Sequence, residues 1–334
     1  MSSFKIENKF IGEGYPTFII AEIGINHNGD FMICKKMIKS AYESGANGVK
    51  IQTVDESSSY IEGTKSYDLF KNKDFTDKEL LKLRNYSKKL GVIFFSTPGD
   101  IKSFKRLLRI KTSILKISSG LSSNYPLIRQ ILKSKTPLII STGMSTIKDI
   151  KELNQYIKKF RFKKIAIMKC TSQYPAQPEN LNLKSINYMK KISQFPIGYS
   201  DHAMGDTAVV VAVANGASLI EKHFTLNKKL KGADHFISLE PKEFKEMVRK
   251  IRITEKALGE KNFNLNKKIK KNKNIFSRHL TAIKDINVGD RLNLSNIGFM
   301  RHKTVNSSLP PNYFFKIENK RSKYFFKKGQ LIKK

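Results

Sequence analysis

Two histidines, His202 and His223, have the residue type and spacing of a metal site. His202 follows a short apolar run, residues 196–200, and His223 ends a second run, residues 218–223; an apolar helical pattern with Asp206 as its N-cap joins the two runs. This order is typical of a strand–helix–strand unit, in which parallel strands lie about 4.8 Å apart and end at one edge. Two imidazoles at that edge can hold one catalytic metal ion and leave positions for water or substrate. In the alternative interpretation, each histidine hydrogen-bonds within its own loop.

Two lysines interrupt apolar strand patterns. Lys50 and Lys116 each lie among Val, Ile and Leu residues, and burying an ammonium group is costly unless an anion compensates it. In one interpretation, each lysine forms an ion pair with Glu22 or Glu221. In the other, the two lysines and the hydroxyls at neighbouring strand ends form a pocket for a phosphate and a carboxylate. These residues favour a metal-assisted enzyme that acts on a small phosphorylated anion.

The elements that must position these side chains are eight short β-rich runs separated by helical patterns. They occupy residues 17–24, 48–53, 91–97, 114–120, 137–143, 164–171, 196–200 and 218–223. Their alternation predicts an α/β protein with a (β/α)₈ TIM barrel, in which chemistry is carried by the C-terminal ends of the strands. A doubly wound parallel sheet is the alternative, but no Gly-x-Gly-x-x-Gly motif follows any run.

The composition changes after Gly259, which divides the chain into three parts. Residues 1–259 are predicted to form the barrel, and residues 260–274 form a Lys/Asn-rich linker. Residues 275–334 contain short alternating segments separated by turn sequences, which predict a small β-rich domain.

The net charge of +35 is the most extreme feature of the composition. A positive field attracts anions, nucleic acids among them, but the lysines are scattered and no nucleic-acid-binding motif accompanies them. We therefore predict no specific nucleic-acid partner and a field that gathers a small anionic substrate. The chain has two cysteines, no signal-peptide pattern and no apolar run near the roughly 18 residues of a membrane span. These features predict a cytoplasmic protein without a membrane partner.

Several motifs, in matching order, resemble those of the sialic acid synthases, the group that includes N-acetylneuraminate, legionaminate and pseudaminate synthases. They cover nearly the whole predicted barrel and occupy residues 21–29, 50–53, 96–98, 141–144, 170–171 with 174–175, 200–202, 220–225, and 232–235 with 238–241. The segment 277–289 resembles the antifreeze-like (SAF) domain that follows the barrel in this family.

The resemblance implies the reaction. Phosphoenolpyruvate condenses with an open-chain N-acylmannosamine-type sugar, either N-acetylmannosamine or a 2,4-diacetamido-2,4,6-trideoxy-hexose, to give a nine-carbon 2-keto sugar acid and phosphate. It also implies a divalent metal, Mn²⁺ or Mg²⁺, on His202 and His223, where the ion acts as a Lewis acid on the sugar aldehyde. The third histidine of this region, His235, is interpreted as part of the loop structure.

The resemblance also implies roles for the polar strand ends. The positions that match phosphoenolpyruvate contacts are Lys50, Thr97, Lys116, Ser119, Ser172 and Ser200. The positions that match groups around the sugar, the water and the metal shell are Glu22, Gln52, Tyr174, Glu221 and Asp234. Family members are domain-swapped homodimers, and Arg301 matches an arginine that reaches the partner's sugar; a surface cation is the alternative for this residue.

Three positions depart from the family pattern. Leu121 stands where the family has a glutamate that helps to bind or deprotonate the sugar, and Gly99 replaces an aromatic residue. The lid sequence Arg-Pro-Gly reads Arg301-His302-Lys303. These departures affect the choice of sugar, together with the excursion at residues 55–74, more than the reaction class. The alternative function is a catalytically weakened relative that binds a sugar acid or a polysaccharide.

Overall fold

The computed structural model describes residues 3–260, 264–302 and 308–333, and these form two compact units, residues 1–259 and 260–334. Lys303 of the lid sequence and residues 261–263 of the linker lie outside the described residues. Each unit is described by itself below.

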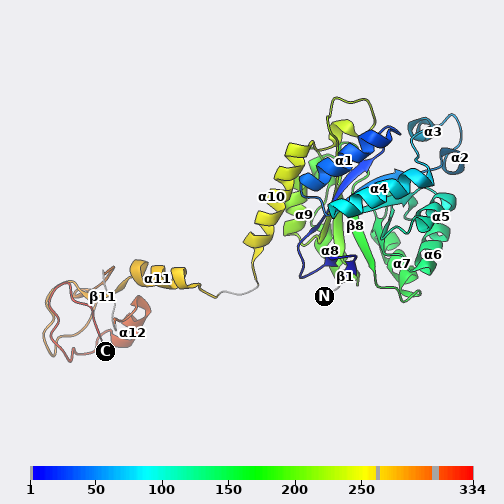
Figure 1. Ribbon diagram of the computed structural model, residues 1–334. Helices are drawn as coiled ribbons and strands as arrows, with labels where there is room; N and C mark the ends of the chain where they lie inside the picture. The colour runs from blue at the N-terminus through cyan, green and yellow to red at the C-terminus, as the bar shows by residue number, and fades with distance from the viewer. Residues whose placement is uncertain (1–2, 261–263, 303–307, 334) are drawn as a thin grey trace. The chain divides into compact units, whose positions relative to one another are not determined.

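The first unit is a closed barrel of parallel strands wrapped by helices (Figure 1). The barrel strands are β3 (Phe18–Gly24), β4 (Gly48–Thr53), β5 (Ile93–Pro98), β6 (Leu115–Ile117), β7 (Leu138–Ser141), β8 (Ile165–Cys170), β9 (Ile197–Asp201) and β10 (Leu219–His223). They follow one another around the barrel in chain order, and β10 closes the ring on β3. This confirms the predicted (β/α)₈ barrel.

A helix follows each barrel strand, and these helices cover the outside of the barrel. They are α1 (Phe31–Glu43), α4 (Asp77–Leu90), α5 (Ile101–Arg109), α6 (Tyr125–Ser134), α7 (Ile147–Lys158), α8 (Ser185–Ile192), α9 (Thr207–Ala214) and α10 (Pro241–Leu258). The excursion between β4 and α4 carries two short helices, α2 (Glu56–Ser59) and α3 (Lys65–Phe70). The ion pairs Asp55–Lys102 and Asp74–Arg106 attach both ends of this excursion to α5.

The helix starts follow local sequence signals, with one exception. Thr76 and Glu79 form a capping box at α4, which satisfies backbone N–H groups that have no partner within the helix. Asp206 precedes α9 as predicted, but its side chain makes no capping bond. Its carboxylate instead accepts a hydrogen bond from Lys250 of α10 at 3.0 Å. Asp206 therefore attaches one helix to the next.

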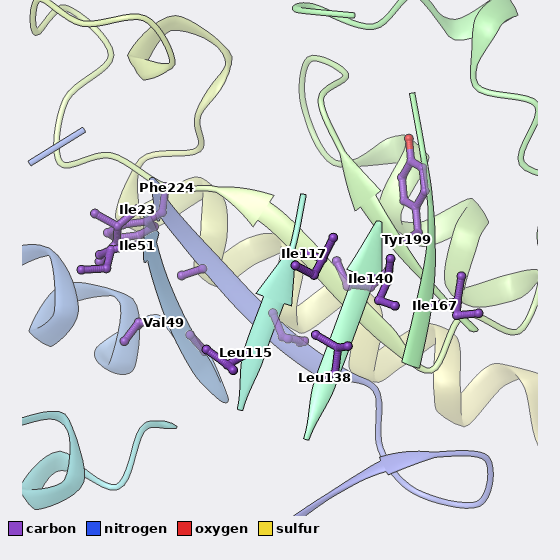
Figure 2. Close-up of a cluster of buried hydrophobic side chains, with 14 of the residues drawn as sticks. Ile23, Val49, Ile51, Leu115, Ile117, Leu138, Ile140, Ile167, Tyr199 and Phe224 are labelled. Carbon is purple, nitrogen blue, oxygen red and sulfur yellow. The ribbon is translucent and has the colours of Figure 1, made fainter. Parts of the chain in front are cut away.

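Two apolar clusters hold the barrel together. The larger lies between the strands and the helices, and Figure 2 shows ten of its labelled side chains, Tyr199 among them. The smaller fills the barrel interior near the N-terminal strand ends, where Phe18, Ile20 and Ile93 meet Phe4 and Ile11. The last two come from the hairpin of β1 (Ser3–Ile6) and β2 (Lys9–Gly12), which closes this end of the barrel. The opposite end is left for polar groups.

The second unit has its own small core. Its elements are α11 (Lys267–Phe276), β11 (His279–Ala282), β12 (Ile297–Met300) and α12 (Phe314–Ile317). The two strands are antiparallel, and isolated bridges extend the β structure over an apolar core that includes Leu280, Ile297 and Phe326. Helix α11 begins inside the segment predicted as a linker, because Asn266 caps it and a run of lysines favours helix. The antifreeze-like assignment of this unit stays a prediction.

No helix among the described residues is both long enough and apolar enough to cross a membrane.

Gly198 of β9 gives a test of the barrel packing. A Cβ atom built at this position lies 2.7 Å from the Leu219 carbonyl oxygen and against the Leu219 side chain on the neighbouring strand. We expect Gly198→Ala to lower the free energy of unfolding of the barrel by about 1–3 kcal/mol, as overpacking does. Chemical denaturation measures the change. Gly120→Ala is the control, since a Cβ there meets nothing within 4 Å; equal stability of the two variants would contradict the packing.

Candidate active site

A polar cavity of about 200 Å³ opens at the C-terminal ends of the barrel strands. It is lined by Glu22, Lys50, Gln52, Lys116, Ser118, Ser119, Gly120, Ser141, Met144, Cys170, Ser172, Tyr174, Ser200, His202, Glu221 and His223. The strand register explains this gathering, because residues paired across parallel strands face the same side. Glu22 is paired with Lys50 on β4 and with His223 on β10, and Glu221 is paired with Ser200 on β9.

Two ammonium groups and two carboxylates form one buried network. Lys50 Nζ lies 2.7 Å from Glu22 Oε2 and 3.7 Å from Glu221 Oε1. Lys116 Nζ lies 2.8 Å from the same oxygen of Glu221, across the barrel interior. All four side chains are at most 6% exposed. Ion pairing, the first of the two interpretations of these lysines, is therefore present, and both lysines also line the cavity.

The network shifts the pKa values of its two carboxyl groups in opposite directions. Burial opposes the charge of Glu221, but Lys116 and Lys50 outweigh it and lower the Glu221 pKa to about 2. Burial raises the pKa of Glu22 above its ordinary value, aided by the charge of Glu221 and opposed by Lys50. Burial also lowers the pKa of Lys116, whereas for Lys50 the two carboxylates outweigh burial and raise the pKa. Glu221 is thus firmly ionised and Glu22 is the carboxylate that protonates more easily.

Hydroxyl and amide groups surround this network. Thr97 accepts a hydrogen bond from Lys50 Nζ at 3.2 Å, and Ser200 donates one to Glu221 at 3.1 Å. Gln52 Nε2 donates to Glu22 at 3.3 Å. Ser119 Oγ accepts a bond from the Gly143 backbone N–H at 2.9 Å. Ser172 is nearby as well, because a Cβ built at Gly143 would lie 2.5 Å from Ser172 Oγ and 2.7 Å from Ser119 Oγ.

The two predicted metal ligands face one another at one side of the cavity. The His202 and His223 ring centroids are 5.4 Å apart, and Tyr174 stacks on His202 at 4.0 Å. His202 Nδ1 lies 2.8 Å from the Thr171 carbonyl oxygen, so this nitrogen carries the proton and Nε2 is the free ligand atom. Burial lowers the pKa of His223 well below its ordinary value, aided by Lys50, and therefore favours a neutral ring. At His202 burial acts in the same direction, but the contact with Cys170 outweighs it and raises the pKa.

The donor set fits a metal ion held by two imidazoles. The buried Nδ1 of His223 has no hydrogen-bond partner. Within the described ranges, no group of three or more His, Cys, Asp and Glu side chains is arranged to hold a metal. His202 and His223 would therefore supply two ligands, and water or substrate would supply the others.

Asp234 lies at the same side as the histidines. Its Oδ2 atom is 3.8 Å from His223 Nδ1, and burial raises the pKa of its carboxyl group. The side chains of Glu22, Gln52 and Asp234 converge on Gly24, since a Cβ atom there would lie within 3.7 Å of all three. His235 instead hydrogen-bonds to Thr225 at 2.7 Å, in agreement with its interpretation as loop structure.

Arg301 is the predicted site residue that lies outside the barrel unit. It belongs to the second unit, where its Nε donates to the Phe276 carbonyl oxygen at 2.9 Å and its guanidinium lies over the Phe276 ring. The structure also shows what surrounds Leu121 and Gly99, the two positions in the barrel that depart from the family pattern. Leu121 is partly buried against the larger apolar cluster. At Gly99, the place of a Cβ is already crowded by Val54 and Ser59.

Sequence reasoning did not assign a site role to several residues that line the cavity. Ser141, Met144 and Cys170 are the clearest, and the buried Ser141 hydroxyl has no hydrogen-bond partner. Strand alternation would have found two of them, because Ser141 and Cys170 end strands whose inward residues lie two positions apart. Cys170 Sγ lies 3.8 Å from His202 Nδ1, a contact that no sequence pattern indicates.

A (β/α)₈ barrel with a buried polar pocket at the C-terminal ends of its strands has the architecture of a TIM-barrel enzyme, because the active sites of such enzymes lie at these strand ends. The chain belongs to the NeuB family, whose sequence model matches residues 37–263. An uncharacterized protein of Methanocaldococcus jannaschii is 40% identical over 301 residues, which cover 90% of this chain and 89% of that protein. This confirms the family resemblance inferred from the motifs.

Several proteins similar to this chain are named as sugar acid synthases. The N,N'-diacetyllegionaminic acid synthase of Legionella pneumophila is 32% identical over 311 residues, covering 88% of this chain and 87% of that enzyme. The crystal structure of an N-acetylneuraminic acid synthetase from Leptospira borgpetersenii, in complex with citrate, superposes with a TM-score of 0.78 at 34% identity. It covers 81% of this chain and 95% of that one.

The charge network makes acid stability a test of Glu221. Its folded-state pKa of about 2 lies below the ordinary value of 4.5, so the ionised group stabilises the fold above pH 4.5, and this contribution is lost as the pH falls toward 2. We expect Glu221→Gln to lose about 3–5 kcal/mol of stability near neutral pH, because Lys116 is left uncompensated. We also expect its stability to fall less steeply than that of the wild type across that acid interval.

Chemical denaturation at a series of pH values measures both effects. Glu152→Gln, which replaces an exposed glutamate of α7, is the matched control and should follow the wild-type curve. If Glu221→Gln and the wild type lost stability in parallel below pH 4.5, the assignment of the ionised form to Glu221 would be wrong.

Proposed function

We propose that the chain joins phosphoenolpyruvate to an open-chain N-acylmannosamine-type sugar and releases phosphate, which gives a nine-carbon 2-keto sugar acid. Membership in the NeuB family supports this proposal. The observation that carries it is the composition of one cavity, in which two buried lysines face two buried histidines. A pair of cations suited to a phosphate and a carboxylate thus lies beside a pair of imidazoles suited to a metal.

The lysine side of the cavity is assigned to phosphoenolpyruvate. Lys50 and Lys116 supply charge, and the hydroxyls of Ser119, Ser172 and Ser200 supply hydrogen bonds to anionic oxygens. Thr97 accepts a hydrogen bond from Lys50 Nζ and so restrains the position of this ammonium group. The net charge of +35 attracts such an anion from solution.

The bond changes balance without any oxidant or reductant. C3 of phosphoenolpyruvate forms a bond to the aldehyde carbon of the sugar, and the aldehyde oxygen takes up a proton to become a hydroxyl group. Water then adds at C2 with loss of a proton. Cleavage of the bond between C2 and the phosphate oxygen, with loss of the proton of the new C2 hydroxyl group, leaves a ketone and releases phosphate, which takes up that proton.

Acidic groups on the histidine side are assigned to these proton movements. Glu22, Gln52 and Asp234 converge at one point beside the histidines. Among the two network carboxylates, Glu22 has the raised pKa and can accept and return a proton, whereas Glu221 stays ionised and orients water or the metal shell. Tyr174 fixes the His202 ring by stacking on it.

We assign a divalent metal, Mn²⁺ or Mg²⁺, to His202 and His223. Bound there, it would supply a Lewis acid that polarises the sugar aldehyde. The hydrogen bond from His202 Nδ1 to the Thr171 carbonyl oxygen orients the ring with Nε2 free, which is the usual outer contact of a metal-bound imidazole.

We further propose a cytoplasmic, domain-swapped homodimer without a specific nucleic-acid or membrane partner. Arg301 is assigned to the partner's sugar because, among the described residues of its own unit, its guanidinium contacts a backbone carbonyl and an aromatic ring and no carboxylate. The free thiols of Cys34 and Cys170 are consistent with a reducing compartment.

A second candidate function follows from Leu121. Its side chain packs against the apolar cluster, so this position supplies no carboxylate to the sugar. A relative weakened in catalysis would bind a sugar acid or a polysaccharide without turnover. The choice of sugar depends on the same position and on the excursion that carries α2 and α3.

Phosphate release tests the proposed reaction. We expect Mn²⁺-dependent release from phosphoenolpyruvate with one member of a panel containing N-acetylmannosamine and 2,4-diacetamido-2,4,6-trideoxy-hexoses, and loss of release in EDTA. His202→Asn and His223→Asn should each lose at least about 100-fold in rate, because each removes half of the metal's protein ligands.

His279→Asn, which changes a histidine of the second unit, is the matched control and should keep the wild-type rate. Binding of phosphoenolpyruvate without release for any sugar would favour the second candidate function. Restoration of release by Leu121→Glu would then attribute the loss to this position.

The domain-swapped dimer can be tested by complementation. We expect Arg301→Ala and Lys116→Met to be inactive alone, since each removes a charge assigned to substrate. In a mixed dimer, the Arg301→Ala subunit has an intact barrel and the Lys116→Met subunit has an intact Arg301. One of the two sites is therefore complete. Random pairing should then restore about a quarter of the wild-type phosphate release. A mixture that stays inactive, although mass spectrometry shows mixed dimers, would mean that Arg301 serves its own subunit.

A further inference from the structure

Lys222 is a buried cation that the proposed reaction does not use. It lies between Glu221 and His223 on β10, and strand alternation turns its side chain away from the cavity, into the layer between strands and helices. Its Nζ atom lies 2.7 Å from Asp201 Oδ2, and both side chains are 0% exposed. The same ammonium group donates a hydrogen bond to the Ala203 carbonyl oxygen. Lys222, which precedes His223, therefore binds Asp201 and Ala203, the two residues on either side of His202.

Asp201 completes this arrangement from the other strand. Its Oδ1 atom accepts a hydrogen bond from the Ala203 backbone N–H at 2.9 Å, which closes a turn with His202 at its centre. The same Oδ1 atom accepts a hydrogen bond from the Tyr199 hydroxyl group at 2.9 Å. Figure 2 shows the hydroxyl oxygen at the end of the buried Tyr199 ring. The strand register pairs Lys222 directly with Asp201. Asp201 therefore uses Oδ1 within its own segment, residues 199–203, and Oδ2 to bind Lys222 of β10.

We propose that Asp201 and Lys222 form a positioning pair, which fixes His202 relative to His223 from the outer side of the barrel wall. This inference rests on the proposed function, in which the two imidazoles bind one metal ion. Buried ion pairs often add little stability compared with apolar residues of similar size, so stability alone does not account for the pair. Its geometry joins the two strands at the positions next to the ligands, and a metal site requires its ligands to be held to within about 0.5 Å.

The test is the neutral double variant Asp201→Asn with Lys222→Met. It leaves an oxygen that accepts from Tyr199 and Ala203 but removes the link to β10, and it buries no unpaired charge. The chain has six histidines, so ¹³C labelling at Cε1 gives one NMR signal for each, assigned by single His→Asn variants. In the metal-free double variant at fixed pH, we expect the signals of His202 and His223 to shift while the His279 signal stays in place.

Metal binding gives the second measurement. We expect Mn²⁺ affinity, measured by electron paramagnetic resonance, to be about 10–100-fold weaker in the double variant. Ile131→Ala is the matched control, because it removes a fully buried side chain of α6 and lowers the unfolding temperature without touching β9 or β10. It should leave both histidine signals and the Mn²⁺ affinity unchanged.

The two proposals fail in different ways. A wild-type protein that binds neither Mn²⁺ nor Mg²⁺ would overturn the metal assignment, and the metal-free histidine signals would still decide whether the pair positions the rings. Unchanged His202 and His223 signals in the double variant would overturn the positioning inference. Equal shifts in Ile131→Ala would do the same, since they would follow from lost stability alone.

Discussion

The mouth of the barrel depends on a balance of buried charge. Two ammonium groups and two carboxylates lie inside a closed ring of strands, where an isolated charge costs several kcal/mol or more. Only the complete set is tolerable, because every member compensates another. The groups assigned to phosphoenolpyruvate are therefore also the groups that make the polar end of the barrel stable. Lys50 and Lys116 cannot be exchanged one at a time without changing the protonation of Glu22 and Glu221.

Strand alternation places a second buried ion pair on the outer side of the barrel wall. Along β10, Glu221 and His223 face the cavity, while Lys222 between them faces the helices. The inward carboxylate meets Lys116, and the outward ammonium meets Asp201. One short strand thus takes part in two charge systems, one on each side of the sheet. The inner system faces the cavity and the outer one is buried from solvent, so the outer contacts can hold geometry while the proposed substrate changes the partners of the inner ones.

Local periodicity allowed the barrel and the inward-facing polar strand ends to be predicted, whereas the resemblance to the sialic acid synthases supplied the roles proposed for the site residues. Apolar runs mark the strands, and alternation places Lys50, Glu221 and the histidines on the inner face. The partner of Lys116 could not be chosen from Glu22 and Glu221, because its contact with Glu221 spans the barrel rather than adjacent strands. The crowding around Gly99 and the start of helix α11 within the linker likewise depend on contacts that periodicity does not contain.

Charge balance also bears on the proposed binding of phosphoenolpyruvate. With Lys50 and Lys116 charged and both carboxylates ionised, the network is neutral, so a phosphate and a carboxylate entering it bring excess negative charge. The carboxylate with the raised pKa, Glu22, is the one whose protonation can offset that excess. Glu221, held by two lysines and by Ser200, stays ionised. Two carboxylates driven apart in pKa are the arrangement that acid–base chemistry requires, which supports assigning the proton to Glu22 rather than to its neighbour.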